Sequence, residues 1–357
     1  MKLLPTVLLS LLLSGALLVF AGCPKPQSAT TPPPVPTPTA AAPGGTVNLV
    51  LAAYTVPKEA YQKVVIPAFQ KYWKEKTGQD VTFTESYEAS GAQSRAICSG
   101  LEADVAALSL AADVDRIKKK GLITADWTAG KNKGMITNSV VALGVRVGNP
   151  KGITKNWESV AKSGIQVVCP NPETSGGAQW DVNAVYGGGL KENKQDEAKA
   201  ADLLRRVRKN IKVMDKSGRA SMTTFETGVG DVIITYENEL LLRNMKEHKY
   251  DVILPNATLL IENPAAVVDA NVDKHNVRKV AAAFVEFLYS KEAQRGFAQY
   301  GFRSVDPEIA KEFKDKYPVP SQLFTMEYLG GWDKVNKTIY GPDGLWARIG
   351  REVGTSK

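Results

Sequence analysis

The chain has 357 residues, of which 43% are hydrophobic and 23% are charged, and it carries a net charge of +8. This composition is that of a soluble globular protein, and the length allows about two domains at roughly 150 residues per domain. The positive charge fits an anionic ligand, an anionic membrane surface or nucleic acid. The lysines and arginines are scattered and form no nucleic-acid-binding module, however, so we expect no nucleic acid as a partner.

The N-terminus has the pattern of a secretory signal. Lys2 precedes an apolar run over residues 3–20, which small residues close, so residues 1–22 read as a signal peptide. Cys23 follows directly, and the whole stretch resembles a bacterial lipoprotein signal. That resemblance implies a lipid at Cys23 after cleavage, and an exported protein held to a membrane in the periplasm or at the cell surface. The alternative is a plain signal peptide with an incidental cysteine.

Residues 23–45 consist largely of Pro, Thr and Ala and contain almost no large apolar side chain. Such a stretch cannot bury enough surface to fold, so we expect a semi-extended tether. No later stretch is long and apolar enough to span a bilayer.

From residue 46 the chain alternates between strand-like and helix-like segments. Strand patterns cover residues 46–54, 80–85 and 103–108, and a helix with one apolar face covers 58–76, where Pro67 predicts a kink. This alternation indicates an α/β fold with a mostly parallel sheet. In such sheets, ligands bind beyond the carboxyl ends of the strands.

Further strand patterns follow in the second part of the chain. They cover residues 140–147, 165–169, 231–237 and 251–254. The long strand at 140–147 has no obvious place in a single domain. A helix with Val280, Phe284, Phe287 and Leu288 on one side comes later, and a short helix pattern ends the chain.

The stretch 171–180 carries the strongest functional signal. It follows a short buried strand, and Thr174 and Ser175 offer N-cap hydroxyls to a helix-compatible segment. Gly176 and Gly177 leave backbone N–H groups uncovered at the positive end of the helix dipole. Strand, turn and helix together predict an anion socket, with an ordinary capped helix start as the alternative. The stretch is neither a P-loop nor a nucleophile elbow, because it lacks the lysine of the first and the leading glycine of the second.

The remaining reactive side chains give weaker signals. Cys98 and Cys169 could form one disulfide, although two separate thiols are at least as well supported. His248 and His275 are isolated among charged residues, which favours surface positions over ligation or catalysis. We find no metal-ligand spacing and expect no cofactor.

The motifs after residue 46, in their order and spacing, resemble those of the periplasmic sulfate-binding proteins of ABC importers. The resemblance runs from about residue 47 to residue 332. It is carried by Ser90-Gly91, Leu101-Glu102-Ala103-Asp104-Val105, Asn149-Pro150-Lys151, Pro170-Asn171-Pro172, Ser175-Gly176-Gly177-Ala178, Phe225, Gly228-Val229-Gly230-Asp231-Val232, Glu237-Asn238-Glu239, Phe287-Leu288-Tyr289-Ser290 and Gly330-Gly331-Trp332.

This resemblance implies a type II periplasmic-binding-protein fold, in which two α/β lobes with mostly parallel sheets close over a dehydrated anion. Lobe 1 would comprise residues 46–141 and 262–320, and lobe 2 residues 142–261. The chain would cross between them near 140–147 and again near 254–264, in a two-segment hinge. Residues 321–357 would pack on the lobes.

The resemblance also implies an anion held by backbone N–H groups and a few side chains. The matching positions are Ser90 and Gly91 in lobe 1, Ser175, Gly176 and Gly177 in lobe 2, Gly218 or, with a slip of one residue, Arg219, and Tyr236 at the family's indole position. Thr55 stands where the family has an aspartate. Thr55 and Tyr236 therefore depart from the family pattern and leave the exact oxyanion open.

A pocket made of donors alone suits sulfate, which only accepts hydrogen bonds, whereas phosphate usually carries a proton that needs an acceptor. We can assign no carboxylate to the anion, although Glu85, Glu88 and Glu173 stand near the loops. Phosphate titrates near a pKa of about 6 and sulfate does not, so this pocket predicts sulfate binding that varies little with pH.

We therefore predict a monomeric, lipid-anchored receptor that delivers sulfate to the permease subunits of an ABC importer, without catalysis. Thiosulfate, molybdate and phosphate are alternative ligands. A secreted hydrolase with Ser175 or Ser90 as nucleophile is less well supported, because neither histidine belongs to a motif that supplies a base.

Overall fold

The structure, a computed structural model, describes residues 45–355. The predicted signal peptide, Cys23 and nearly all of the predicted tether lie outside the described residues. No helix in the described range has the length and apolar character needed to cross a membrane.

The described part is a mixed α/β body built on a curled ten-stranded sheet. Its strands are β1 (Thr46–Tyr54), β2 (Asp80–Glu88), β3 (Val105–Ala107), β4 (Met135–Arg146), β5 (Val167–Pro170), β6 (Ile211–Asp215), β7 (Val232–Tyr236), β8 (Tyr250–Ile253), β9 (Ala257–Val267) and β10 (Gln322–Phe324). The strand order is β2-β1-β3-β9-β4-β7-β5-β6, with β8 paired to β4 and β10 to β9.

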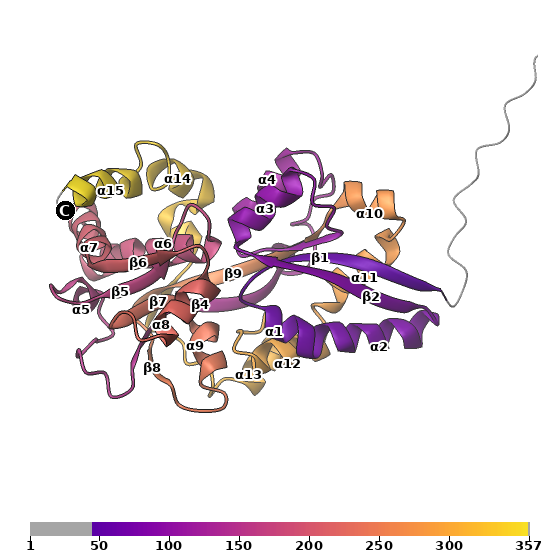
Figure 1. Cartoon of the computed structure of the whole chain (residues 1–357), viewed down its shortest axis with the longest axis horizontal. Coiled ribbons are helices and arrows are strands. Elements are labelled where there is room, and N and C mark those ends of the chain that lie inside the picture. Colours follow the sequence, from indigo (N-terminus) through magenta and orange to yellow (C-terminus); the bar gives the residue numbers. More distant parts are fainter. Residues whose placement is uncertain (1–44, 356–357) are drawn as a thin grey trace, which may run out of the picture. The chain divides into compact units, whose positions relative to one another are not determined.

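Helices cover the sheet on both sides (Figure 1). They are α1 (Lys58–Ala60), α2 (Ile66–Thr77), α3 (Ser90–Cys98), α4 (Ala111–Lys119), α5 (Glu158–Ala161), α6 (Gly176–Glu192), α7 (Glu197–Asn210), α8 (Gly218–Glu226), α9 (Glu237–Arg243), α10 (Asp269–His275), α11 (Arg278–Phe287), α12 (Lys291–Gln299), α13 (Pro307–Glu312), α14 (Gly331–Thr338) and α15 (Leu345–Thr355).

The long strands β4 and β9 join two parts of the sheet. They pair with each other, antiparallel, between Met135–Val140 and Leu260–Pro264. Beyond that ladder β9 pairs with β3, and β4 pairs with β7 and β8. We call the side that holds β1, β2 and β3 the first half of the body, and the side that holds β5 to β8 the second half (Figure 1).

Within each half the strands that lead into helices are parallel. β1 pairs in parallel with β2 and β3, and β5 pairs in parallel with β6 and β7. The antiparallel pairings all involve β4 or β9, because these strands carry the chain between the halves. The predicted mostly parallel sheets are therefore confirmed within each half. Parallel strands place their carboxyl ends, and the loops that follow, at one edge of the sheet.

Two expected boundaries differ from the observed ones for reasons of strand pairing. β2 continues to Glu88 because it pairs with β1 along its whole length. β4 begins at Met135, not at residue 140, because its first residues complete the ladder with β9.

The irregularity expected at Pro67 takes the form of a π-helical turn. This turn covers Tyr61–Val65, between α1 and α2, and Pro67 lies in the first turn of α2. Proline has no N–H to donate, so the hydrogen-bond ladder must be interrupted close to it. The helix still buries Tyr61, Phe69 and Trp73, and the Phe69 ring centroid lies 5.0 Å from that of Phe284 on α11.

The C-terminal segment packs on the second half. β10 extends the sheet beside the start of β9. Trp332 in α14 meets Trp180 of α6 edge-to-face, with ring centroids 4.9 Å apart, and the guanidinium of Arg208 in α7 lies 3.8 Å from the Trp346 ring centroid.

Both cysteines in the described residues are free, Cys169 being buried and Cys98 half-buried. This answers the disulfide question in favour of two separate thiols. His275 is partly exposed and pairs with two carboxylates, since Nδ1 lies 2.8 Å from Asp104 Oδ1 and Nε2 lies 3.0 Å from Glu102 Oε2. The two carboxylates come from the turn before β3, which the sequence did not place beside α10.

Candidate functional site

A small enclosed cavity lies between the halves, at the carboxyl ends of their parallel strands. The first half contributes Tyr54, Thr55, Val56, Ala89, Ser90 and Ser109; the second contributes Pro170, Ser175, Gly177, Asp181, Gly218, Thr235 and Tyr236. The space open to the centre of a water-sized sphere is about 10 Å³, close to the minimum that holds one water molecule. The cavity as it stands therefore admits only a ligand of a few atoms.

Three helices begin at this cavity. Ser90 is the first residue of α3, Gly177 the second of α6 and Gly218 the first of α8. The first N–H groups of a helix have no intrahelical partner and lie at the positive end of its dipole. Three such ends around one small cavity make a site for an anion.

Ser175 is the N-cap residue of α6, and its side chain makes no capping hydrogen bond. The corresponding serine of α8, Ser217, is different, because its Oγ accepts a hydrogen bond of 3.2 Å from the Ala220 N–H. Thr174 is also occupied, since its hydroxyl donates to the carbonyl of Lys216 at 2.9 Å. The Ser175 hydroxyl is therefore available to donate a hydrogen bond to a ligand in the cavity that Ser175 lines.

Ser90 reaches the cavity wall with its hydroxyl already engaged. The hydroxyl donates to Asp113 Oδ2 at 2.6 Å and accepts from the Ser109 N–H at 3.0 Å. Asp113 is itself paired with Arg116 at 2.6 Å. The Ser90 side chain therefore fixes the loop after β3, and the N–H groups at the start of α3 remain the donors of this region.

Ser109 was not predicted, and its hydrogen bonds connect the two halves at the cavity. Its Oγ lies 2.5 Å from the Tyr236 hydroxyl, and its carbonyl accepts from Trp180 Nε1 at 3.0 Å. The same carbonyl accepts from Asn263 at 3.1 Å. Its only signal in the sequence is its position directly after the strand pattern 103–108.

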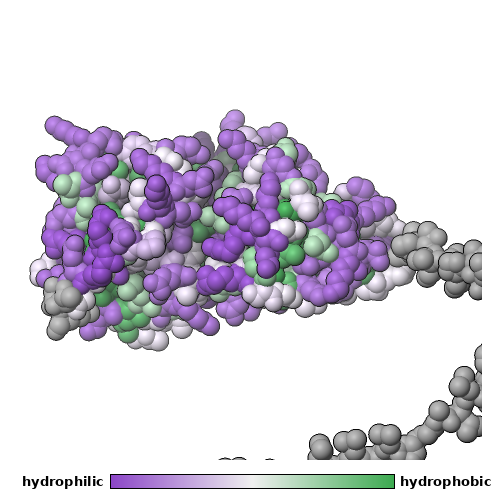
Figure 2. All heavy atoms as spheres, turned by 90° about the horizontal axis from the view of Figure 1, so that it is seen from above, coloured by the Kyte–Doolittle hydropathy of each residue, from purple (hydrophilic) through white to green (hydrophobic). Residues whose placement is uncertain are grey.

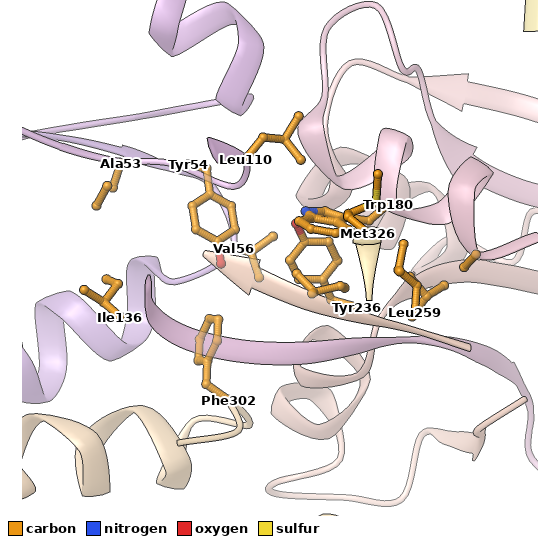
Figure 3. Close-up of a cluster of buried hydrophobic side chains, with 14 of the residues drawn as sticks. Ala53, Tyr54, Val56, Leu110, Ile136, Trp180, Tyr236, Leu259, Phe302 and Met326 are labelled. Atoms are coloured by element: carbon orange, nitrogen blue, oxygen red, sulfur yellow. The ribbon is translucent and has the colours of Figure 1, made fainter. Parts of the chain in front are cut away.

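Side chains of both halves surround these hydrogen bonds (Figure 3). Tyr54, Val56 and Leu110 of the first half face Tyr236 and Trp180 of the second. The ring centroids of Tyr54 and Tyr236 are 6.2 Å apart. Burial raises the pKa of the Tyr236 hydroxyl, so this group keeps its proton at neutral pH. Thr55, at the other departure from the family pattern, also lines the cavity.

Gly91 and Gly176 do not line the cavity but lie where the two halves touch. A Cβ added to Gly176 would come within 2.8 Å of Leu110 Cγ and Ser109 Oγ. A Cβ added to Gly91 would come within 3.1 Å of the Thr174 carbonyl oxygen. Glycine at both positions lets helices of opposite halves approach closely.

The guanidinium of Arg219 is held away from the cavity by two carboxylates. It makes hydrogen bonds of 2.5 and 2.8 Å to Glu59 of the first half, and one of 3.1 Å to Glu239. Burial opposes the ionisation of Glu59, but the hydrogen bond from Arg219 outweighs it and holds the Glu59 pKa below its ordinary value. Arg219 therefore links the halves beside the cavity and does not line it.

Asp181 also lines the cavity and was not predicted. Only 3% of it is exposed, and neither carboxylate oxygen has a hydrogen-bond partner. Burial raises its pKa well above the ordinary value. It stands four residues after Gly177 and thus on the same face of α6.

Asp181 corrects the expectation of a cavity without a carboxylate. The glutamates considered from the sequence do not line the cavity: Glu88 and Glu173 are exposed, and Glu85 accepts a hydrogen bond from Tyr87 at 2.6 Å. No lysine, arginine or histidine lines the cavity among the described residues. His248 is bonded to Asp251 and His275 to Asp104 and Glu102, so neither is placed to activate Ser175 or Ser90.

Comparisons with known proteins agree with this geometry. Residues 49–303 match the family model described as bacterial extracellular solute-binding protein. The chain is 42% identical, over 312 residues, to a sulfate-binding protein of Synechococcus elongatus, with 87% of this chain and 88% of that protein covered.

A thiosulfate-binding protein of Pseudomonas aeruginosa is 36% identical over 307 residues, covering 84% of this chain and 91% of that protein. Among solved structures, the sulfate-binding protein SubI from Mycobacterium tuberculosis H37Rv superposes with a TM-score of 0.75 at 37% identity. That superposition covers 81% of this chain and 98% of SubI.

Proposed function

Because the chain belongs to the bacterial extracellular solute-binding proteins, and among them to the sulfate-binding protein family, we propose that it captures sulfate in the cavity between its halves. The observation that carries this proposal is the meeting of three helix N-termini around a cavity in whose wall no described residue is cationic. Sulfate needs donors on all sides, and hydrogen bonds to a charged group are worth about 1.5–3 kcal/mol each.

The fold is the type II periplasmic-binding-protein fold that the sequence predicts. Within it, we assign lobe 1 to residues 46–141 and 262–320 and lobe 2 to residues 142–261, with β4 and β9 as the hinge. Binding then proceeds by closure of the lobes, since the cavity wall comes from both. The contacts of Ser109 and Arg219 across the halves support a closed arrangement in this structure.

Sulfate held in this way is passed to the permease subunits of an ABC importer. The proposed partner follows from the family, whose members bind solutes outside the cytoplasm. We further propose a lipid at Cys23 and an attachment to the membrane through the predicted tether, residues 23–45. A monomer fits the face in Figure 2, where hydrophilic residues predominate and hydrophobic residues form small separate patches.

Thiosulfate is the second candidate ligand. It is supported by the similarity to the thiosulfate-binding protein of Pseudomonas aeruginosa. The sequence identity to that protein is lower than the identity to the sulfate-binding protein of Synechococcus elongatus. A dianion of similar size would meet the same donors.

Calorimetric titration of the mature chain with sulfate, thiosulfate, molybdate and phosphate tests this function. We expect sulfate to bind most tightly and with one site per chain. Ser99→Ala, which changes an exposed serine outside the cavity, is the control variant and should bind as the wild type does. Failure of sulfate to bind, or tighter binding of another oxyanion in the panel, would refute the assignment.

A further inference from the structure

Asp181 is a buried acid in an anion cavity, and no cationic side chain among the described residues lines that cavity with it. Its side chain lines the cavity, it is 3% exposed and both of its oxygens lack a partner. The Tyr54 hydroxyl, in the opposite wall, is also buried without a partner. Two unpaired polar groups facing one small cavity indicate that the ligand itself completes their hydrogen bonds.

The direction in which Asp181 points follows from its place on α6. It lies one helical turn after Gly177, and a Cβ added to Gly177 would come within 3.4 Å of the Tyr236 ring. Asp181 therefore lies one turn further along α6 than the free N–H groups at the start of this helix. It is on the face of α6 that packs against the end of β7.

The titratable and charged groups around Asp181 come from each element packed on this end of α6. Besides burial, the Asp181 charge raises the pKa values of Cys169 of β5, Tyr236 of β7 and Tyr340 of the C-terminal segment, and Tyr54 of β1 lines the same cavity. Further out, Asp113 of α4 acts on Tyr236, and Asp215 of β6 and Arg208 of α7 act on Cys169. Arg208, the only cation in this set, stacks on the Trp346 ring and donates to the Trp346 carbonyl. None of these groups supplies Asp181 with a counter-charge.

An ionised Asp181 would also repel the ligand. A carboxylate beside a bound dianion places like charges together in a region shielded from water, which disfavours the charged form of the acid. A neutral carboxylic acid has instead one O–H to donate, which is what a sulfate oxygen accepts.

On the basis of the proposed function, we propose that Asp181 is a specificity-determining residue that enters the closed cavity as a neutral carboxylic acid and donates a hydrogen bond to the bound dianion. If Asp181 is ionised in the open protein, sulfate binding is coupled to the uptake of one proton from solution, which Asp181 receives. This replaces the pH-independent binding expected of a cavity without a carboxylate.

The sign of the pH dependence follows from the two states of the site. In the closed site burial raises the Asp181 pKa well above the ordinary value, whereas opening exposes the carboxyl group to water and lowers its pKa toward the usual value of about 3.9. Sulfate affinity is therefore full below the open-state pKa. It falls by up to about tenfold per pH unit as the pH rises between the open-state and closed-state values.

The test is titration calorimetry of the mature chain with sulfate at pH 7 in two buffers of different ionisation enthalpy, which counts the protons taken up. We expect close to one proton per sulfate for the wild type, and a dissociation constant that rises between pH 6 and pH 8. Asp181→Asn keeps the shape and a donor but cannot titrate, so we expect no proton uptake and a dissociation constant that stays constant over this range. Asp315→Asn, at an exposed position, is the matched control and should behave as the wild type does.

Three results would overturn this inference. Wild-type binding of sulfate without proton uptake, at constant affinity from pH 6 to 8, would mean that Asp181 stays in one protonation state. Phosphate binding within tenfold of sulfate that disappears in Asp181→Asn would mean that Asp181 is an ionised acceptor for a protonated oxyanion. If sulfate binds to neither chain at any pH, the proposed function fails together with the inference. The wild-type proton count does not depend on how well the variant folds.

Discussion

The two walls of the cavity differ in how far their polar groups are satisfied before a ligand arrives. In the first half, the Ser90 hydroxyl is bonded to Asp113 and the Ser109 hydroxyl to Tyr236. In the second half, Ser175 caps nothing with its side chain, and Asp181 has no partner at all. Tyr54 is the exception in the first half, because its buried hydroxyl has no partner. The difference between the serines indicates that the second half offers most of the binding groups, while the serine hydroxyls of the first half are already fixed in place.

Of the variants considered, Gly176→Val should weaken sulfate binding most, because it prevents the two walls of the cavity from meeting. The new side chain would meet Leu110 and Ser109, which a Cβ alone would already approach to 2.8 Å. Closure would be blocked, and we expect sulfate affinity to fall by more than about hundredfold, which corresponds to a few kcal/mol. Titration calorimetry measures the loss. Gly130→Val, where an added Cβ meets nothing within 4 Å and φ is −80°, is the control and should bind normally.

Ser175→Ala and Ser90→Ala should separate the two walls. Loss of the Ser175 hydroxyl removes one hydrogen bond to a charged ligand, so we expect binding to weaken by about 1.5–3 kcal/mol with little change in the unfolding midpoint. Loss of the Ser90 hydroxyl leaves Asp113 short of a donor, so we expect the free energy of unfolding to fall by about 1–3 kcal/mol. Its binding loss should be the smaller of the two. The reverse pattern in calorimetry and urea unfolding would contradict the comparison.

Glu59→Gln tests the link that holds the halves together beside the cavity. The variant loses the charge paired with Arg219 at 2.5 Å, but a partly exposed pair contributes only about 0.2–1 kcal/mol. We expect sulfate affinity to fall by about two- to fivefold at pH 7. The Glu59 pKa is lowered in the closed protein. The stabilisation by the Glu59–Arg219 pair is therefore complete at a pH above the ordinary glutamate pKa, and it is lost as the pH falls through the lowered pKa of Glu59. An unchanged affinity would show that the pair does not contribute to closure.

His275 tests a part of the first half that lies outside the cavity. Hydrogen bonds to Glu102 and Asp104 raise its pKa in the folded protein. The stabilisation is therefore fully present below the unfolded-state pKa, near 6.5 on the usual scale, and it is lost as the pH rises through the higher folded value. We expect the wild type, but not His275→Asn, to lose a small amount of stability in urea between pH 6 and pH 8. Sulfate affinity should be the same in both chains, and a change in it would place His275 in the binding machinery.

Local patterns were enough to predict an α/β fold with mostly parallel strands and two of the three helix starts at the cavity, whereas the type II fold and the start at Gly218 followed from the family resemblance. Apolar runs marked the strands, and Ser-Gly pairs marked the starts of α3 and α6. Boundaries that depend on a distant partner were not predictable in this way, as the start of β4 at Met135 shows.

Asp181 and Ser109 were missed for a related reason. An aspartate one turn into a helix is expected to face water, and only the packing of α6 against both halves buries Asp181. A single serine after a strand has no motif, and its role appears only when Tyr236 and Trp180 arrive from the other half. The roles of Arg219 and Gly176 likewise depended on which residues of the first half come to lie beside them.

The passage of β9 back into the first half has a consequence for how the chain folds after synthesis. β3 pairs with β1 on one side and with the Ala265–Val267 end of β9 on the other. A chain made from its N-terminus therefore presents β1, β2 and β3 long before β9 exists, and the apolar edge of β3 has no partner during that interval. Pairings between residues so far apart in sequence form slowly, and unpaired strand edges are sites of aggregation. The second half, by contrast, can pair β5, β6 and β7 from one continuous stretch of chain.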